Sequence, residues 1–145
     1  MVKTFSASHT LIFNKPLAQV FAFLSDAEND PTWRKGVKSI RRIGDLAVGA
    51  KYEQTVSGPG GREISADIVV TKFEPNKCVA FETITGPVRP AGEFCFEEAS
   101  LGTRVTFSLK AELSGLKAAV MGPMVQKTMD GEVAALANAK SELER

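Results

Sequence analysis

The sequence predicts an α+β fold in which an antiparallel sheet is covered on one face by a long C-terminal helix. Two features of the sequence support this prediction. One strand, two short helices and a run of strands with alternating apolar residues occupy the chain up to Ser114. Beyond Ser114 the apolar period lengthens to that of an α-helix. With 145 residues, we expect a single domain over residues 1–145 that buries about 70% of the surface of the unfolded chain.

The first strand is expected over residues 3–13, where apolar and hydroxyl side chains alternate. Pro16 then suits the first turn of a short helix, because its φ is already helical and an N–H there would have no partner. One face of this helix is apolar through Leu17, Val20, Phe21 and Leu24. The helix ends at Ser25 and Asp26, and a second short helix and a polar turn lead to Trp33, the only tryptophan.

Six further strands are expected in the central part of the chain. They span Val37–Ile43, Ala50–Ser57, Arg62–Glu74, Cys78–Thr85, Gly92–Glu97 and a last segment after Gly102 that alternates from Val105 to Ala111. The glycine-rich segment Gly58–Gly61 predicts a hairpin turn. Val69 and Phe73 lie on the opposite parity from their neighbours, which predicts a bulge near residue 70.

The C-terminal helix is expected to begin after Ser114, a plausible N-cap. Its apolar stripe comprises Val125, Met129, Val133, Leu136, Ala137 and Leu143. Proline inside a regular helix costs about 3 kcal/mol. Gly122 and Pro123 therefore predict either a kink or a break between a short helix, Gly115–Met121, and the main one.

The composition excludes several functional classes. The net charge of +1 and the lack of a basic block remove the usual signature of a nucleic-acid-binding protein. No apolar run approaches ~18 residues, so no membrane span is expected. The N-terminus resembles no secretory signal, which favours a cytoplasmic location. Cys78 and Cys95 have no metal-ligand spacing and are expected to be buried thiols, so with one histidine we expect no metal and no cofactor.

Several short motifs, taken in order, resemble those of a known superfamily. They are the helix led by Pro16, D-A-E-N-D-P-T-W at Asp26–Trp33, V-G at Val48–Gly49, F-E-P at Phe73–Pro75, G-T-R-V-T at Gly102–Thr106, and the lead-in with Pro123 to a helix ending in S-E-L-E. In this arrangement the chain resembles the START-like, or Bet v 1-like, superfamily (SRPBCC), which includes polyketide cyclase/dehydrase and lipid transport proteins. The resemblance implies a helix-grip fold, in which a seven-stranded antiparallel sheet curls around the C-terminal helix and encloses a hydrophobic cavity.

The resemblance together with strand alternation suggests which side chains line such a cavity. The candidates are Trp33, Tyr52, Gln54, Phe81, Thr83, Phe94, Phe96, Phe107, Met121, Met124 and Val125. The alternative for each apolar candidate is an ordinary filled core. Trp33 is either an anchor for the second short helix or a ring that stacks on the ligand. Tyr52 and Gln54 would orient a buried ligand by hydrogen bonds if their face is inward, and would be solvated edge residues if it is outward.

No catalytic residue is identified from the sequence. Asp67, Glu82 and Glu93 lie in the middle of strands, and an inward carboxylate would need an arginine or hydroxyl partner or would have a raised pKa. Most such carboxylates face water. His9 is either a general base or a packed histidine. Arg89 is either a contact for an anionic head group at the cavity mouth or a solvated loop residue.

Fold membership does not fix activity, because the superfamily includes carriers, cyclases and receptors. The main expectation is a protein that binds a small, largely hydrophobic ligand such as a lipid, an isoprenoid or an aromatic polyketide-like molecule. The alternatives are a cyclase or dehydratase-type enzyme that uses the same cavity, and a protein-interaction module with a filled cavity. We expect a monomer or weak homodimer, with the Gly86–Pro90 connection and the Gly122–Pro123 pair gating entry.

Overall fold

The computed structural model describes residues 1–145 apart from the side chain of Pro59. Its elements in chain order are β1 (Val2–Phe13), α1 (Leu17–Ser25), the 3₁₀ helix η1 (Ala27–Thr32), β2 (Val37–Ile43), β3 (Lys51–Ser57), the short turn η2 (Pro59–Gly61), β4 (Glu63–Ser65), β5 (Ile68–Glu74), β6 (Cys78–Thr83), β7 (Ala91–Ala99), β8 (Gly102–Ser114), α2 (Gly115–Ala134) and α3 (Leu136–Leu143).

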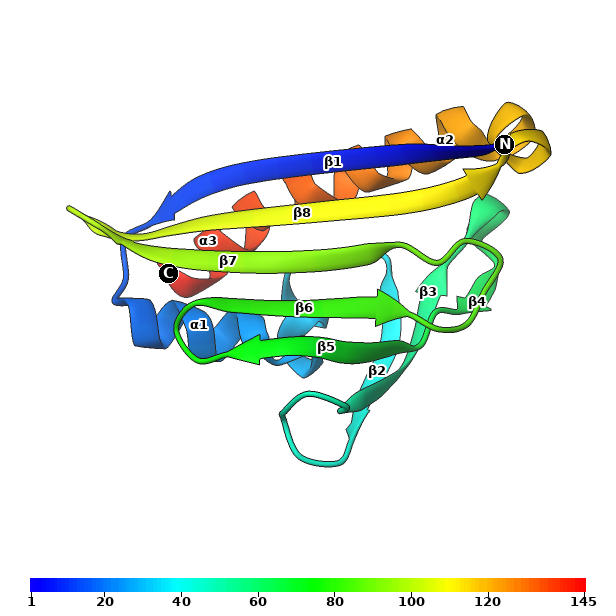
Figure 1. Ribbon diagram of the computed structural model, residues 1–145. Helices are drawn as coiled ribbons and strands as arrows, with labels where there is room; N and C mark the ends of the chain where they lie inside the picture. Colours follow the sequence, from blue (N-terminus) through cyan, green and yellow to red (C-terminus); the bar gives the residue numbers. More distant parts are fainter.

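The strands form one antiparallel sheet in the order β1-β8-β7-β6-β5-β3-β2, and the short β4 pairs with β3. The two longest strands, β1 and β8, pair along their whole length, from Val2 opposite Ser114 to Phe13 opposite Thr103. The sheet curves, and α2 and α3 run along one of its faces (Figure 1). This architecture confirms the α+β helix-grip fold expected from the sequence.

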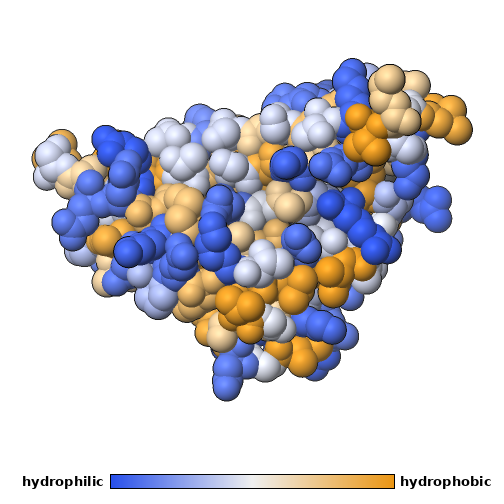
Figure 2. All heavy atoms as spheres, in the orientation of Figure 1, coloured by the Kyte–Doolittle hydropathy of each residue, from blue (hydrophilic) through white to orange (hydrophobic). Residues whose placement is uncertain are grey.

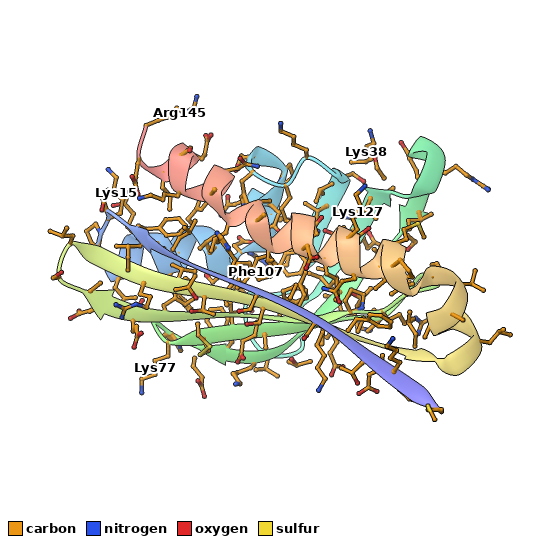
Figure 3. The ribbon with its side chains drawn as sticks, turned by 90° about the horizontal axis from the view of Figure 1, so that it is seen from above. Lys15, Lys38, Lys77, Phe107, Lys127 and Arg145 are labelled. Atoms are coloured by element: carbon orange, nitrogen blue, oxygen red, sulfur yellow. A yellow bond between two sulfur atoms is a disulfide. The ribbon has the colours of Figure 1, made fainter. Side chains whose placement is uncertain are left out.

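The core lies between the curved sheet and the helices. The α2 and α3 helices bury residues three or four positions apart, namely Ala118, Gly122, Val125, Met129, Val133, Leu136 and Ala139. On the sheet side, Phe94 and Phe107 stack with their ring centroids 4.2 Å apart, and Trp33 packs edge-on against both. Viewed from above, Phe107 lies under α2, between the helix and the sheet (Figure 3). Packed aromatic rings therefore cover part of the inner face of the sheet, opposite the helix.

The strand predicted over Arg62–Glu74 is divided into β4 and β5. Side chains take over backbone bonds at this point: the Gln54 backbone N–H donates to Asp67 Oδ1 at 2.9 Å, and the Asp67 backbone N–H donates to Thr85 Oγ1 at 2.7 Å. These contacts replace regular ladder bonds, so the strand is interrupted there. The bulge expected near residue 70 is confirmed by a register shift between Val70 and Lys72.

The α2 helix continues through Pro123, and the division between helical segments falls at Ala135 instead. Of the two outcomes expected at Gly122–Pro123, a kink or a break, the break is therefore wrong. Gly122 lies on the buried side of α2, where a Cβ would come within 2.8 Å of the Phe5 ring. Pro123 lies on the exposed side, where the carbonyl left unpaired by the missing N–H can meet water. Close packing of α2 on β1 thus outweighs the local preference for a break.

Cys78 and Cys95 form a disulfide across β6 and β7, so the expectation of two buried thiols is wrong. The two residues are directly opposite in the antiparallel register, with their Cα atoms 4.3 Å apart. Alternation predicts the two strands but not the register that brings these residues together.

Within the described part of the chain, no helix is long and apolar enough to cross a membrane.

Candidate ligand-binding site

A cavity of about 530 Å³ lies between the inner face of the sheet and α2. Its wall on the sheet side is formed mainly by Ile68, Val70, Val79, Phe81, Phe94, Phe107 and Leu109. The helix contributes Met121, Met124, Val125 and Met129. Methionine side chains are unbranched and polarizable, so this wall can adapt to ligands of different shape. The cavity is therefore mostly apolar, as sites for small molecules usually are.

One end of the cavity is bordered by the connection between β6 and β7. Gly86, Pro87, Val88 and Pro90 of this connection line the cavity together with the N-terminal half of α2. The same half of α2 exposes Leu116, Val120 and Met124 to solvent. Figure 2 shows hydrophobic surface at this end of the molecule, near the start of α2.

Gly92 has no side chain and so leaves room for the side chains of two residues that line the cavity. Gly92 of β7 lies between Phe81 of β6 and Leu109 of β8 in the sheet register. A Cβ at Gly92 would overlap the Phe81 ring and come within 2.9 Å of Leu109 Cδ2. Gly92 itself does not line the cavity, whereas Phe81 and Leu109 do. The positions of the Phe81 and Leu109 side chains thus depend on the absence of a side chain at Gly92.

The opposite end of the cavity is polar and centres on Arg34. Its Nη1 donates to Asp30 Oδ2 at 2.8 Å and to Gln54 Oε1 at 3.1 Å, and its Nε donates to Glu132 Oε2 at 2.8 Å. Asp30 and Arg34 are four residues apart on either side of Trp33, while Glu132 comes from α2. Arg34 and Glu132, together with Gly36, also line a hollow of about 380 Å³, so this ion pair borders both spaces.

Asp30 is the buried carboxylate of this cluster, with 5% of its surface exposed. Burial raises the pKa of Asp30 to about 6, although the Arg34 guanidinium opposes this rise. Its Oδ1 atom is buried and has no hydrogen-bond partner among the described residues. The carboxyl group can therefore change its protonation state near neutral pH, and one of its oxygens lacks a hydrogen-bond partner among the described residues.

The polar groups of Tyr52 and Gln54 are already bonded within the protein. The Tyr52 hydroxyl donates to Asp26 Oδ1 at 3.0 Å and accepts from the Ala27 backbone N–H at 3.3 Å. Burial and the neighbouring Asp26 raise the pKa of Tyr52 to about 12, so the phenol remains protonated. Gln54 accepts from Arg34 and donates its Nε2 to the Ala66 carbonyl at 2.8 Å. Both residues face the cavity, but their hydrogen bonds serve the fold.

The structure brings most of the candidate cavity residues to one place. Those that line the cavity are Tyr52, Gln54, Phe81, Thr83, Phe94, Phe107, Met121, Met124 and Val125. Trp33 and Phe96 lie outside the lining. Trp33 packs against Phe94 and Phe107, and Phe96 packs against Phe21 of α1 with ring centroids 5.1 Å apart. These two aromatic residues fix the short helices on the sheet.

The strand carboxylates considered from the sequence lie away from the cavity. Asp67 accepts a hydrogen bond from the Gln54 backbone N–H at 2.9 Å, and Glu93 pairs with Lys72 at 2.7 Å on the outer face. Glu82 is exposed. His9 is half-buried opposite Phe107, and the Arg89 side chain donates to the Gly86 carbonyl at 3.1 Å.

Asp30, Arg34 and Glu132, which the sequence analysis did not single out, are instead the charged residues at the cavity. The only signal in the sequence was the spacing of an Asp and an Arg around the lone tryptophan.

One group of possible metal ligands lies on the outer face of the sheet. The ligand atoms of Cys78, Glu93 and Cys95 are all within 4.8 Å of one another. The two sulfur atoms are bonded to each other, and Glu93 is paired with Lys72. In this state the group cannot offer thiolates, the form in which cysteine binds a metal.

Comparison with known proteins relates the chain to one family by sequence. The family model for polyketide cyclase / dehydrase and lipid transport matches residues 4–144. A search of curated protein sequences gives no match.

Three solved structures illustrate the similarity of fold. The di-domain ARO/CYC protein BexL of the BE-7585A biosynthetic pathway is 20% identical with a TM-score of 0.77, and the match covers 95% of this chain and 49% of BexL. A point mutant of norcoclaurine synthase from Thalictrum flavum is 15% identical with a TM-score of 0.77, covering 99% and 95% of the two chains. Protein TTHA0849 from Thermus thermophilus is 18% identical with a TM-score of 0.76, covering 96% and 95%. The chain thus spans about half the length of BexL.

Proposed function

Because the chain belongs to the polyketide cyclase / dehydrase and lipid transport family, we propose that it binds a small, largely hydrophobic ligand in the cavity between the sheet and α2. A lipid, an isoprenoid or an aromatic polyketide-like molecule has the required character. The observation that carries the proposal is the mostly apolar cavity of about 530 Å³. This volume lies within the range of about 300–1,000 Å³ that is usual for sites of small ligands.

Burial of the ligand supplies the main favourable free energy of binding. Each buried CH₂ group contributes roughly 0.8 kcal/mol, so a ten-carbon chain contributes about 8 kcal/mol before the losses of association. Those losses, about 4–15 kcal/mol, include the translational and rotational freedom of the ligand and any ordering of the β6–β7 connection. Larger or more rigid apolar ligands, which bury more surface or lose less freedom, should therefore bind most tightly.

The test is native mass spectrometry, with organic extraction, of protein purified gently from its own host. We expect a co-purifying apolar molecule at close to one per chain. A matched pair of variants on α2 locates it: Met121 lines the cavity, whereas the adjacent Val120 is exposed. Met121→Trp should fill part of the cavity and reduce the bound amount, and Val120→Trp should not. A chain that carries no molecule in any form would argue against stable ligand binding.

A second candidate function is catalysis of the cyclase or dehydratase type in the same cavity. The favouring observation is the meeting of Asp30, Arg34 and Glu132 at its polar end. With a pKa of about 6, Asp30 can accept or release a proton near neutral pH. Two of the similar structures are named as an ARO/CYC protein and a synthase, which supports this alternative. The distinguishing result is a ligand that the native chain converts, but Asp30→Asn does not, to a product with a changed mass after loss of water or with a changed retention time after ring closure.

The proposal also includes a cytoplasmic location, a monomer or weak homodimer as the working form, and no nucleic-acid partner. The absence of a basic block in a chain of net charge +1 supports the last point. The Cys78–Cys95 disulfide argues against the cytoplasmic location, since disulfides are rare in the cytosol. Free thiols in protein from its own host would support the cytoplasm, and a disulfide would argue against it.

A further inference from the structure

The outer face of the sheet carries three possible ligand groups that the cavity does not use. Cys78 of β6 is directly opposite Cys95 of β7, and Glu93 precedes Cys95 by two residues on the same strand. The neighbouring Val79 and Phe94 are buried in the core, so strand alternation turns the three ligand residues outward. Each of the three is partly exposed, and their ligand atoms all lie within 4.8 Å of one another. A cation can therefore reach this group from solvent.

The backbone beneath these ligands is held on both sides. β6 pairs with β5 and β7, and β7 pairs with β6 and β8, so neither strand is at an edge of the sheet (Figure 1). Around a tetrahedral zinc ion with Zn–S bonds of about 2.3 Å, two sulfur ligands are about 3.8 Å apart. Side-chain rotations alone can produce this spacing from ligand atoms that already lie within 4.8 Å. The fixed register thus preforms a three-ligand site.

The site becomes available when the Cys78–Cys95 bond is reduced. A dithiol compound does this by exchange: its two sulfur atoms join each other, the Sγ–Sγ bond breaks, and the two protons of the dithiol pass to the cysteines. A Zn²⁺ ion then displaces one proton from each thiol into solvent. The reverse exchange with a disulfide compound takes up two protons, re-forms the Sγ–Sγ bond and releases the ion.

We propose that the reduced chain binds one Zn²⁺ ion through Cys78 Sγ, Cys95 Sγ and a carboxylate oxygen of Glu93, with water as the fourth ligand, and that formation of the disulfide releases it. Three protein ligands and one water are a common coordination for zinc. Thiolates favour this ion over Mg²⁺ and Ca²⁺, which prefer oxygen ligands. The inference goes beyond the proposed function and does not depend on it, because the site lies on the face of the sheet away from the cavity.

The charge next to the site suits a zinc ion with these ligands. Two thiolates and one carboxylate carry one negative charge more than Zn²⁺ neutralises. Lys72 of β5 donates to Glu93 Oε2 at 2.7 Å and can balance that excess. A carboxylate has two oxygens, so Glu93 can bind the ion through one and keep Lys72 on the other.

The experiment compares the two redox forms of the native chain. One sample is reduced with an excess of dithiol, freed of it by gel filtration without oxygen, and titrated with Zn²⁺ by calorimetry at about pH 7.5. We expect one ion per chain, bound at least about a hundredfold more tightly than by the oxidised chain, because loss of a ligand costs more than the tenfold to hundredfold loss from a hydrogen-bond partner of a ligand. Cd²⁺ in place of Zn²⁺ should give the ultraviolet absorption of metal–thiolate bonds. Equal affinities of the two forms, or Cd²⁺ binding without this absorption, would overturn the proposal.

A matched pair of variants tests the carboxylate ligand. Glu93 and Glu97 lie two residues before and two residues after Cys95 on the same face of β7, but Glu97 pairs with Arg104 and is outside the group of ligands. Glu93→Gln should weaken Zn²⁺ binding by at least about tenfold, and Glu97→Gln should leave it unchanged. Equal affinities of the two variants would overturn the assignment of Glu93.

The test remains decisive if reduction unfolds the chain. An ion that binds only the folded form shifts the equilibrium toward it, so Zn²⁺ should then restore the far-ultraviolet circular dichroism of the oxidised chain. A reduced chain that stays unfolded with Zn²⁺ would overturn the proposal. None of these measurements involves a molecule in the cavity, so each outcome leaves the proposed function as it stands.

Discussion

At the scale of single residues, the most unusual group at the cavity is a carboxyl group whose burial disfavours its charged form. Asp30 is almost fully buried in η1, and Arg34 satisfies only one of its oxygens. Burial disfavours the charged form more than the nearby guanidinium favours it, so the pKa of Asp30 rises to about 6. The buried carboxyl group at the polar end of the cavity is therefore one that weakens the fold when it is ionised.

The pH dependence of stability should reveal this effect. In the unfolded chain an aspartate has a pKa near 4, so between about pH 4 and 6 the folded protein holds a proton that the unfolded chain has lost. The free energy of unfolding should therefore fall as the pH rises through this window, by up to about 3 kcal/mol from this group. The measurement is urea unfolding at pH 4.5 and 7 for the native chain and Asp30→Asn.

The comparison with Asp30→Asn isolates the contribution of Asp30. Glu144, whose pKa is lowered chiefly by its hydrogen bond to Lys140, gives the opposite pH dependence in both proteins and cancels. We expect the native chain to lose stability relative to Asp30→Asn on going from pH 4.5 to 7. The same pH dependence in the two proteins would contradict the assignment.

The role of Asp30 could not be predicted from the sequence. The segment Asp26–Trp33 contains several acidic residues, and nothing in its local pattern shows which one turns inward. The burial of Asp30 depends on Arg34, and Arg34 is held in turn by Glu132 from the far end of the chain. By contrast, Tyr52 and Gln54 are two residues apart on one strand, so their common face follows from strand alternation alone.

At the scale of elements, α2 is anchored unevenly along its length. Its first half exposes Leu116 and Val120 and borders the cavity. The α3 helix that follows buries Leu136 and Ala139 completely. Asn138 of α3 also donates to the Trp33 carbonyl at 3.2 Å. Local stability should therefore increase from the start of α2 toward the end of the chain.

Amide hydrogen exchange should show this gradient. We expect the amides of residues 119–122 and 124 to exchange faster than those of residues 140–143, although α3 is shorter and lies at the end of the chain. Binding of a ligand in the cavity should slow exchange in the first segment and leave the second unchanged. Faster exchange in α3 than at the start of α2 would show that the buried contacts do not set local stability here.

The sequence predicted the positions of the strands and helices better than the points at which they are interrupted. Alternation located every long strand, because each has one face on the core and one toward solvent. The interruption at Ala66 and Asp67 was missed, since it depends on hydrogen bonds to residues in other segments. A break, one of the two outcomes expected at Pro123, does not occur for a similar reason: the contact between Gly122 and Phe5 joins α2 to the first strand of the chain.

At the scale of the whole molecule, a covalent bond joins two neighbouring strands in the middle of the sheet. Cys78 and Cys95 are 17 residues apart, and their bond closes the β6–β7 connection, part of which borders the cavity. A loop of this length constrains the unfolded chain enough to stabilise the fold by about 3 kcal/mol. Reduction therefore affects the stability of the entire domain.

Urea unfolding with and without a reductant measures this contribution. We expect the native chain to lose about 3 kcal/mol of its free energy of unfolding when the disulfide is reduced. The double variant Cys78→Ser, Cys95→Ser should have similarly low stability in both conditions. A native chain that is insensitive to reductant would indicate that the two cysteines are not bonded in solution.

The lack of a side chain at Gly92 also makes the cavity adjustable from outside its lining. A Cβ there would overlap the Phe81 ring and come within 2.9 Å of Leu109, so Gly92→Ala must displace both side chains. Both side chains line the cavity and Gly92 does not, so one methyl group would change the shape of the pocket while every lining residue keeps its identity.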